Sequence, residues 1–387
     1  MVPDEGAPNG LPLAGIRVAD FSRVLAGPLA TMLLADLGAD VVKVERPETG
    51  DDTRGWGPPF VHGDAAYFLS LNRNKRSVTL DLSTDEGRSA ARRLAVASDV
   101  VVENFRPGLM QRFGLDHETL SAERPDLVYC SLTAFGDRAG SRPGYDIIVQ
   151  ALSGLMSFTG QPGGEPTKVG VALLDVICGL YAANAIQSAL LRRSSTGRGG
   201  HVTVSLFDAS VAALVNQAAN YLLGGLVPGP LGNAHPNIVP YQLFAASDRP
   251  FIVAAGNDRL FERTCEVMGR PELATDERFV TNADRVRHRE ALIPILSEAF
   301  AARTADEWVE ALESASVPSA PVRTVDEVFA SAEGAAALQE VDDPIRGLLR
   351  LVAEPIHVDG RVPPVRLPPP RLGEHTVQVL AEIEPDD

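Results

Sequence analysis

Short apolar runs alternate with polar, helix-like segments through the first third of the chain. The run IRVADF at 16–21 predicts a strand of a parallel sheet, because such strands are covered on both faces and are apolar throughout. Pro28 is expected as the first residue of the following helix, where its missing N–H would be unbonded in any case, and Gly38 is expected to end that helix. The run VVKVE at 41–45 then completes a βαβ unit.

The same alternation continues over the next 90 residues or so of the sequence. Further strands are predicted for the apolar runs RSVTLDL (76–82), DVVVENF (99–105) and LVYCSLTAF (127–135). A helix is predicted over Thr84–Ala97, and another begins within PGLMQRFGL at 107–115. Strands that alternate with helices are typical of a doubly wound α/β fold with a parallel sheet.

Ligands of doubly wound sheets bind beyond the carboxyl ends of the strands. In this sequence those ends carry Ser22 to Pro28, Arg46, Asn104 with Phe105, and Phe135 with Gly136. We therefore expect a binding site built from these loops.

The pattern changes in the second half of the chain. The Gly- and Pro-rich segment 224–236 marks a boundary. The stretch 238–258 predicts a hairpin, and apolar residues at helical spacing predict helices at 259–269 and within 289–315. These elements indicate a smaller α+β domain that ends near Val322, before a Pro-rich tail and a short helix.

Composition narrows the functional classes. A formal net charge of −16 argues against nucleic-acid binding, because no excess of Lys and Arg is present to neutralise phosphates. Cys130, Cys178 and Cys265 form no CxxC pair, which fits a reducing compartment and predicts neither a disulfide framework nor a zinc site. The opening MVPDEGAPNG is acidic and polar, so we do not expect it to be a signal peptide, and no apolar run reaches the roughly 18 residues that a membrane span needs. We expect a soluble cytoplasmic protein without nucleic-acid or membrane partners.

The first βαβ unit raises the possibility of a dinucleotide site, since its second strand ends in the acidic Glu45. However, the loop SRVLAGP at 22–28 lacks the GxGxxG glycines that let a backbone approach a pyrophosphate. Arg46 offers a cation directly after the acid. The sequence therefore disfavours a nicotinamide or flavin site.

Asp175 is the only carboxylate between Lys168 and Arg193, in a stretch that predicts a helix of about 18 residues. One interpretation is a helix N-cap, in which the Asp175 side chain accepts the N–H of Ile177 or Cys178. The other is chemical, because a carboxylate in an apolar pocket, short of hydration, can serve as a covalent nucleophile.

Six long motifs occur in order along the chain. They are DFSRVLAGP, LGADVVKVERPETGDDTRGWGPPF, LNRNKRSVTLDL, DVVVENFRPG, GYDIIVQALSGLMSFTG and STGRGGHVTVSLFDA. With them the sequence resembles the class III CoA-transferases, the formyl-CoA and carnitine-CoA transferase type, over nearly its whole length. The nucleophile of that family is an aspartate about 15 residues after the TG that ends the GYD segment, and Asp175 holds this position after Gly160.

The resemblance also implies a set of residues that line coenzyme A. They are Leu25, Ala26, Arg46, Leu80, Asp81, Leu82, Ser83, Asn104, Phe105, Arg106, Arg112, Arg142 and Tyr145. Phosphate contact is favoured for Arg46 and Arg112, because a guanidinium matches phosphate with paired hydrogen bonds. For Arg106 and Arg142, phosphate contact and a solvated surface charge stay open as alternatives.

The resemblance implies CoA transfer from an acyl-CoA donor to a free carboxylic acid through an aspartyl-CoA thioester on Asp175. Acyl-CoA and the acid are substrates, and no prosthetic group or metal is implied. The expected chain has a large CoA-binding domain at 1–203, a linker at 204–227, a small α+β domain at 228–324 and a returning C-terminal segment at 325–387. The family further implies an interlocked homodimer.

The sequence departs from the family in places. AAGNDRLF has one glycine where the formyl-CoA branch has several, which disfavours formyl-CoA and oxalate, while GNAHPNIVPYQLF is loosely similar to the branch acting on dicarboxylic acyl groups. Gly200 replaces the usual Gln without an explanation from sequence, and His235 fits either an exposed linker residue or a substrate contact.

Two other functions stay open from the sequence. An α-methylacyl-CoA racemase shares the fold and the aspartate but carries a histidine in GHD, where this chain has Tyr145 in GYD. A phenol with a pKa near about 10 is a poor base at neutral pH, so we favour transfer over racemisation. The second alternative is a CoA-binding protein without catalytic activity, which the retained Asp175 disfavours.

Overall fold

A computed structural model describes residues 10–136, 142 and 144–384 of the chain. The chain divides into two compact units. The first unit comprises Met1–Leu155, Val169–Leu226 and Ala336–Asp387, and the second comprises Met156–Lys168 and Val227–Ala335. Compared with the domain boundaries expected from the sequence, 156–168 and 325–335 belong to the second unit.

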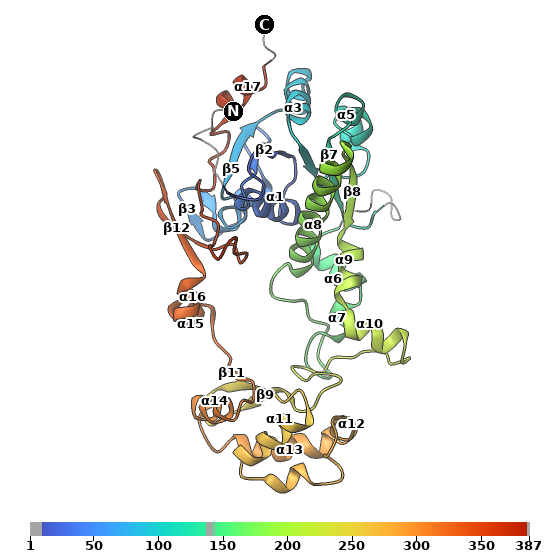
Figure 1. Ribbon diagram of the computed structural model, residues 1–387, viewed down its shortest axis with the longest axis vertical. Coiled ribbons are helices and arrows are strands. Elements are labelled where there is room, and N and C mark those ends of the chain that lie inside the picture. The colour runs from blue at the N-terminus through green and yellow to red at the C-terminus, as the bar shows by residue number, and fades with distance from the viewer. Residues whose placement is uncertain (1–9, 137–141, 143, 385–387) are drawn as a thin grey trace. The chain divides into compact units, whose positions relative to one another are not determined.

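A six-stranded parallel sheet forms the centre of the first unit, as the sequence pattern predicted (Figure 1). Its strands are β1 (Arg17–Asp20), β2 (Asp40–Glu45), β5 (Lys75–Thr79), β6 (Val100–Glu103), β7 (Val128–Thr133) and β8 (Gly200–Ser205). All neighbours in the order β5-β2-β1-β6-β7-β8 are parallel. The direction of winding reverses between β1 and β6, so a crevice opens beyond the carboxyl ends of these two strands.

The edge strand β8 was not predicted from sequence. Its residues alternate between polar His201 and Thr203, which are exposed, and the less exposed Val202 and Val204. Continuous apolar runs, which predicted the other five strands, occur in strands that are buried on both faces.

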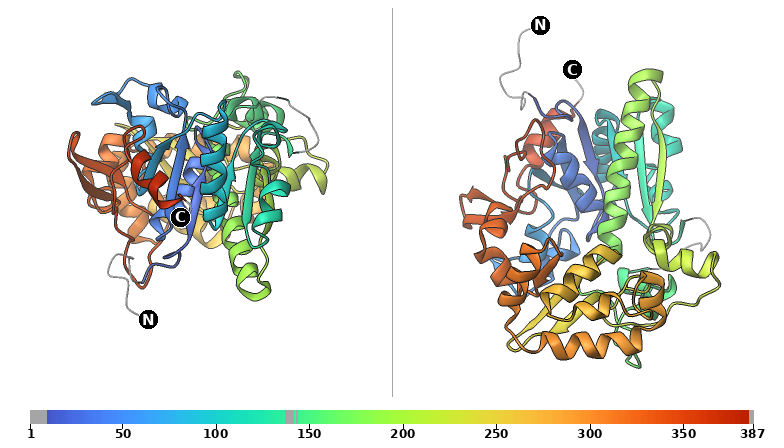
Figure 2. Two further views of the ribbon diagram at one scale, coloured as in Figure 1. Left: turned by 90° about the horizontal axis from the view of Figure 1, so that it is seen from above. Right: turned by 60° about the horizontal axis from the view of Figure 1, so that its bottom comes forward.

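Helices cover both faces of this sheet (Figures 1 and 2). One face packs against α1 (Ala26–Asp36), α8 (Leu173–Thr196) and α9 (Leu206–Ala213), and the other against α3 (Asp85–Ala97), α5 (His117–Glu123) and α17 (Thr376–Glu382). Neighbouring residues of one strand pack on opposite faces of the sheet: Val100 and Val102 pack on the face covered by α1, α8 and α9, whereas Val101 packs on the face covered by α3, α5 and α17. This alternation is the ordinary pleat of a strand.

Helices α1 and α8 pack closely together on the first face. A Cβ atom added at Gly179 of α8 would lie 2.8 Å from the carbonyl oxygen of Ala26, so a glycine permits this approach. Helix α1 starts at Ala26, two residues before the start expected at Pro28, which still lies in the first turn, where no intrahelical N–H bond is needed.

Helix α8 is long and apolar. An 18-residue window of it has a mean hydropathy of 1.4, so its length and composition alone would allow it to cross a bilayer. Ala182, Ala183 and Ile186 of this helix are buried in the core of the first unit. The core helix of a soluble protein can have the same length and hydropathy, so this single helix is weak support for a membrane span.

The remaining elements of the first unit are short. They are η1 (Asp52–Gly55), β3 (Phe60–Val61), β4 (Asp64–Ala65), α2 (Ala66–Leu69), α4 (Leu109–Phe113), α6 (Asp146–Leu152), α10 (Val215–Leu222), β12 (Leu338–Asp343) and β13 (Gly347–Val352). Helices α7 (Leu155–Phe158) and α16 (Ala332–Ala336) lie at the boundaries between the units.

The C-terminal segment joins the first unit beside β5, where Figure 2 shows the red end of the chain next to the blue strands. The N–H of Asn74 donates to the carbonyl oxygen of Leu367 at 2.9 Å. Arg76 on β5 forms an ion pair of 2.7 Å with Glu382 on α17. The first unit is therefore built from both ends of the sequence.

The second unit is a small α+β structure with an antiparallel sheet in the order β11-β10-β9. Its elements are β9 (Tyr241–Ala245), β10 (Pro250–Ala254), α11 (Asp258–Val267), η3 (Pro271–Ala274), α12 (Asn282–Arg287), α13 (Arg289–Phe300), α14 (Ala305–Ser314), β11 (Ser319–Pro321) and α15 (Val325–Ala330). The hairpin expected at 238–258 is β9 and β10. Thr304 and Glu307 form a capping box that starts α14 as a new helix after α13.

Two lysine–carboxylate pairs are completely buried beneath the carboxyl ends of β1 and β2. Lys43 lies 2.8 Å from Asp51, and Lys75 lies 3.2 Å from Asp20. Burial raises the pKa of Asp51, but the neighbouring Lys43 and the Thr53 hydrogen bonds outweigh it and lower that pKa to about 2. Asp51 is therefore ionised at neutral pH and compensates the Lys43 charge.

This arrangement predicts a large cost for removing one partner. Asp51→Asn should lower the free energy of unfolding by about 3 kcal/mol, because an uncompensated ammonium stays buried. Glu340→Gln is the matched control, since Glu340 and Arg350 form an exposed pair whose loss should cost less than about 1 kcal/mol. Urea titrations of the three proteins measure both values, and equal small losses would contradict the importance of the buried pair.

Candidate active site

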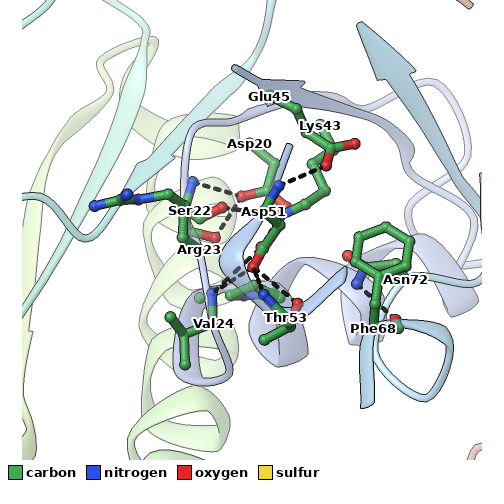
Figure 3. Close-up of polar contacts among 12 residues, drawn as sticks. Asp20, Ser22, Arg23, Val24, Lys43, Glu45, Asp51, Thr53, Phe68 and Asn72 are labelled. Carbon is green, nitrogen blue, oxygen red and sulfur yellow. Dashed lines mark hydrogen bonds and ion pairs between the residues drawn. The ribbon is translucent and has the colours of Figure 1, made fainter. Parts of the chain in front are cut away.

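The loop after β1 is held in an unusual conformation. Val24 has a φ of 71°, a left-handed conformation that a β-branched residue rarely adopts. Its N–H donates to the Asp51 carboxylate at 3.3 Å, and the Lys43 ammonium donates to the carbonyl oxygen of Ser22 at 2.9 Å (Figure 3). The buried Lys43–Asp51 pair thus fixes the backbone that faces the crevice.

Asn104 fixes the same loop from β6. Its side-chain oxygen accepts the N–H of Arg23 at 2.9 Å, and its side-chain nitrogen donates to the carbonyl oxygen of Arg23 at 2.7 Å. Both functional ends of this amide are therefore used within the protein. Asn104, expected as a coenzyme contact, joins the two loops at the switch point of the sheet.

A first cavity of about 230 Å³ opens beyond these strands. Among the residues expected at the site, it is lined by Leu25, Ala26, Asn104, Phe105, Arg106, Arg142, Tyr145 and Asp175. Three of these, Arg106, Arg142 and Tyr145, are exposed. The loops after β1, β6 and β7 therefore meet the first turn of α8 around one cavity.

Asp175 is not the cap of α8, so that interpretation is wrong. The helix begins at Leu173 with Ala172 as its N-cap, and Asp175 lies in its first turn. The capping acceptor comes from another helix: Oδ2 of Asp146 on α6 accepts the N–H of Leu174 at 2.8 Å and the N–H of Asp175 at 3.3 Å. The Asp175 carboxylate is free of a capping role.

The environment of Asp175 disfavours its charge. The side chain is partly buried against the cavity, and it has no hydrogen-bond donor among residues 10–136, 142 and 144–384. Burial, with a further contribution from the like charge of Asp146, raises the pKa of Asp175 to about 7. A poorly solvated carboxylate that is still partly ionised at neutral pH is suited to nucleophilic attack.

A second cavity of about 290 Å³ lies beside β2 and β5. Its lining includes the expected residues Arg46, Leu80, Asp81, Leu82, Ser83 and Phe105. Apolar side chains of Phe21, Val44 and Phe113 complete its walls, and Arg46 is paired with Asp52 at 2.7 Å. Arg23 and Phe105 line both cavities, so the two are adjacent.

Arg112 is the expected residue that these cavities do not include. It is exposed on α4, whose Leu109 and Phe113 face the second cavity instead. Two arginines of the first cavity lie over aromatic rings: the Arg23 guanidinium lies 5.0 Å from the centre of the Phe105 ring, and that of Arg142 lies 4.9 Å from the centre of the Phe135 ring.

Two residues at the site, Asp146 and Tyr67, were not identified from sequence. Arg23 was expected only as part of the loop 22–28, and it lines both cavities. Asp146 lies in the GYD motif, but its contact with α8 spans 28 residues of sequence. Burial and the charges of Asp175, Asp146 and Asp51 raise the pKa of Tyr67 to about 12, which places its phenol in the field of Asp175.

Gly200 and His235, which the sequence left unexplained, each have defined neighbours in the structure. A Cβ at Gly200 would lie 2.1 Å from the Arg192 guanidinium, which donates to the carbonyl oxygen of Gly199 at 2.8 Å, so the glycine leaves room for this contact. His235, in the second unit, lies with its ring 5.3 Å from that of Tyr241. Among the described residues, no cluster of His, Cys, Asp or Glu could hold a metal ion.

Known proteins match the chain over nearly its whole length. The sequence model of CoA-transferase family III matches residues 13–376. The chain belongs to this family. Succinate–glutarate CoA-transferase of Agrobacterium fabrum is 44% identical over 385 residues, 96% of each chain. Succinyl-CoA:glutarate CoA-transferase of Homo sapiens is 40% identical, over 98% of this chain and 88% of the human protein.

A solved structure has the same fold. The crystal structure of a CAIB/BAIF family protein from Brucella suis matches with a TM-score of 0.85 and 45% identity, over 97% of this chain and 100% of that one. Family membership confirms the resemblance seen in the motifs. The protein is a CoA-transferase, an enzyme that moves coenzyme A between an acyl-CoA and a carboxylate.

The raised pKa of Asp175 predicts how the stability of this CoA-transferase depends on pH. In the unfolded chain the pKa of Asp175 is about 3.9, so the folded protein binds the carboxyl proton more tightly than the unfolded chain does. The folding free energy gained from this proton is lost as pH rises through about 7. Asp175→Asn removes the titration. Its stability relative to the wild type should increase by up to about 3 kcal/mol between pH 5 and pH 8 in urea titrations. A difference that does not change with pH would contradict the raised pKa.

Proposed function

We propose that this CoA-transferase works through a covalent relay in which Asp175 is the nucleophile. The observation that carries the proposal is the Asp175 carboxylate itself, which faces a cavity at the switch point of the sheet, lacks a hydrogen-bond donor among the described residues and has a pKa of about 7. Such a group is ionised often enough to react and solvated poorly enough to be reactive.

The covalent relay neither consumes nor releases a net proton or electron. The Asp175 carboxylate attacks the thioester carbonyl, the C–S bond breaks, and a mixed anhydride and the CoA thiolate result. The thiolate then attacks the aspartyl carbonyl and displaces the donor acid, which leaves an aspartyl-CoA thioester. An acceptor carboxylate reverses the two steps and restores free Asp175.

The two adjacent cavities support a placement for coenzyme A. We propose that the adenine lies in the second cavity, between the apolar side chains of Leu80 and Phe113, and that the thioester reaches Asp175 in the first. Arg23 and Arg46 flank the path between them and are suited to the diphosphate. Both arginines contact Asp52 in the free protein, at 3.4 and 2.7 Å, so phosphate binding would replace that partner.

The names of the relatives support dicarboxylic acids as the acyl and acceptor groups, with succinate and glutarate as the first candidates. The first cavity offers Arg106 and Arg142 as cations for a second carboxylate. A charge-assisted hydrogen bond contributes roughly 1.5–3 kcal/mol, which is enough to separate a diacid from a monoacid.

We also propose a cytoplasmic homodimer. The free, buried state of Cys130, Cys178 and Cys265 fits a reducing compartment. Helix α10 contributes no buried residue, and Val215 and Leu222 on it are 70% and 75% exposed. Apolar surface of this kind is typical of an interface.

Replacement of the nucleophile tests the relay. Asp175→Asn should fold and bind CoA while transfer falls by several orders of magnitude, because an amide is a far weaker nucleophile than a carboxylate. Asp85→Asn is the matched control, since Asp85 also lies in the first turn of a helix but has a 93% exposed side chain. Transfer is followed by chromatography of the acyl-CoA products. Substantial activity in Asp175→Asn, without deamidation to Asp, would exclude the covalent role.

Paired acceptors test the substrate class. With succinyl-CoA as donor, glutarate should be used with a kcat/KM roughly tenfold to hundredfold above that of pentanoate, which has the same chain length but one carboxylate. Oxalate and formyl-CoA belong in the same screen, because the single glycine of AAGNDRLF disfavours them. Equal use of glutarate and pentanoate would rule out recognition of the second carboxylate.

A further inference from the structure

A buried chain of hydrogen bonds leads from α6 to the first turn of α8. Asp146 is buried, and its Oδ1 accepts a short hydrogen bond from the amide nitrogen of Gln150, one turn along α6. The other end of the Gln150 amide accepts the N–H of Val169 at 3.0 Å. Oδ2 of Asp146 accepts the N–H groups of Leu174 and Asp175. Both Asp146 oxygens therefore act as acceptors inside the protein.

This position gives the Asp146 charge two effects on Asp175. The N–H groups at the start of α8 would otherwise favour a nearby anion, and Asp146 already occupies two of them. Its negative charge also lies next to the residue that must carry the nucleophilic charge. An amide acceptor could cap the helix equally well, so capping alone does not explain a carboxylate here.

We propose that Asp146 is a positioning residue that holds the first turn of α8 and, through its charge, destabilises the free carboxylate of Asp175 relative to the covalent intermediates. This inference rests on the proposed covalent function of Asp175. The anhydride and the thioester are uncharged at the aspartyl group, so their formation removes the repulsion from Asp146. The covalent enzyme is thereby favoured at equilibrium, and the free carboxylate is made more nucleophilic.

Burial and Asp146 are the causes of the raised pKa of Asp175, which supports this arrangement. Other titratable groups lie on elements that pack against α8, namely Asp36 on α1, Cys130 on β7, His201 on β8 and Asp208 on α9. Cys178 lies on α8 itself, Tyr67 on α2 interacts electrostatically with Asp175, and the charged residues Arg23, Asp52, Arg106 and Arg142 line the cavity. None of them is altered in the variants below. A difference between the variants therefore reports the charge at position 146.

Two variants separate the charge from the hydrogen bonds. Asp146→Asn removes the charge and keeps an acceptor for α8, but places a donor against the Gln150 amide. The double variant Asp146→Asn/Gln150→Glu restores that contact in the reverse direction, keeps an acceptor for Val169, and moves the charge one side chain further from Asp175. Asp116→Asn is the matched control, because Asp116 caps α5 through the N–H of Thr119 at 3.2 Å.

The experiment uses the full chain with succinyl-CoA and measures two quantities by mass spectrometry. They are the pH dependence of the rate at which Asp175 becomes modified, and the fraction of aspartyl-CoA thioester at equilibrium. In Asp146→Asn the acid limb should move to lower pH, and the thioester fraction should fall by about threefold or more, which corresponds to half a pH unit. The double variant should lie between Asp146→Asn and the wild type, and Asp116→Asn should match the wild type.

Each other result has a distinct meaning. An unchanged acid limb and thioester fraction in the folded double variant would overturn the role of the Asp146 charge, even if Asp146→Asn alone does not fold. Absence of any Asp175 modification in the wild type would instead overturn the proposed covalent function.

Discussion

The first turn of α8 begins in a place where its backbone N–H groups need acceptors from elsewhere in the protein, and this constraint shapes the site. A helix start leaves several N–H groups without intrahelical partners. Asp146 satisfies two of them from α6, so the side chain of Asp175 in the same turn is not consumed as a cap. The carboxylate is left facing a cavity, with burial and a like charge acting against its ionisation. The reactivity expected of the Asp175 carboxylate follows from its lack of hydrogen-bond donors among the described residues.

The opposite wall of the cavity depends on a second set of buried charges. Lys43 and Asp51 hold the loop after β1 in a conformation that Val24 would not adopt alone. Asn104 links that loop to β6 through both ends of its amide. Arg23, Arg106, Arg142 and Phe105 also line this cavity. Rigid support of this kind is what a site needs to hold reacting groups in a fixed geometry.

Local patterns predicted much of this architecture. Continuous apolar runs identified five of the six strands, and the lone acid in an apolar helix singled out Asp175, whose role as nucleophile was implied by the family resemblance. The cap of α8 depends on a distant residue, because the acceptor for its first N–H groups comes from Asp146 on α6. Strand β8 was missed for a local reason, since it alternates polar and apolar residues at the sheet edge and lacks a continuous apolar run. The grouping of residues 156–168 with the second unit has no local signal, because these residues separate two segments of the first unit.

Transfer of an oxygen isotope tests the covalent role of Asp175 most directly. An acceptor acid labelled with ¹⁸O in its carboxylate should leave one labelled oxygen on Asp175 in each turnover, because the bridging oxygen of the second anhydride stays with the aspartyl group when CoA leaves on the new acyl chain. Trypsin releases residues 169–192 as one peptide, in which Asp175 is the single carboxylate side chain, so mass spectrometry can locate the label without ambiguity. The account predicts a mass increase in this peptide that requires both acyl-CoA and acceptor. Continued turnover with unlabelled Asp175 would contradict it.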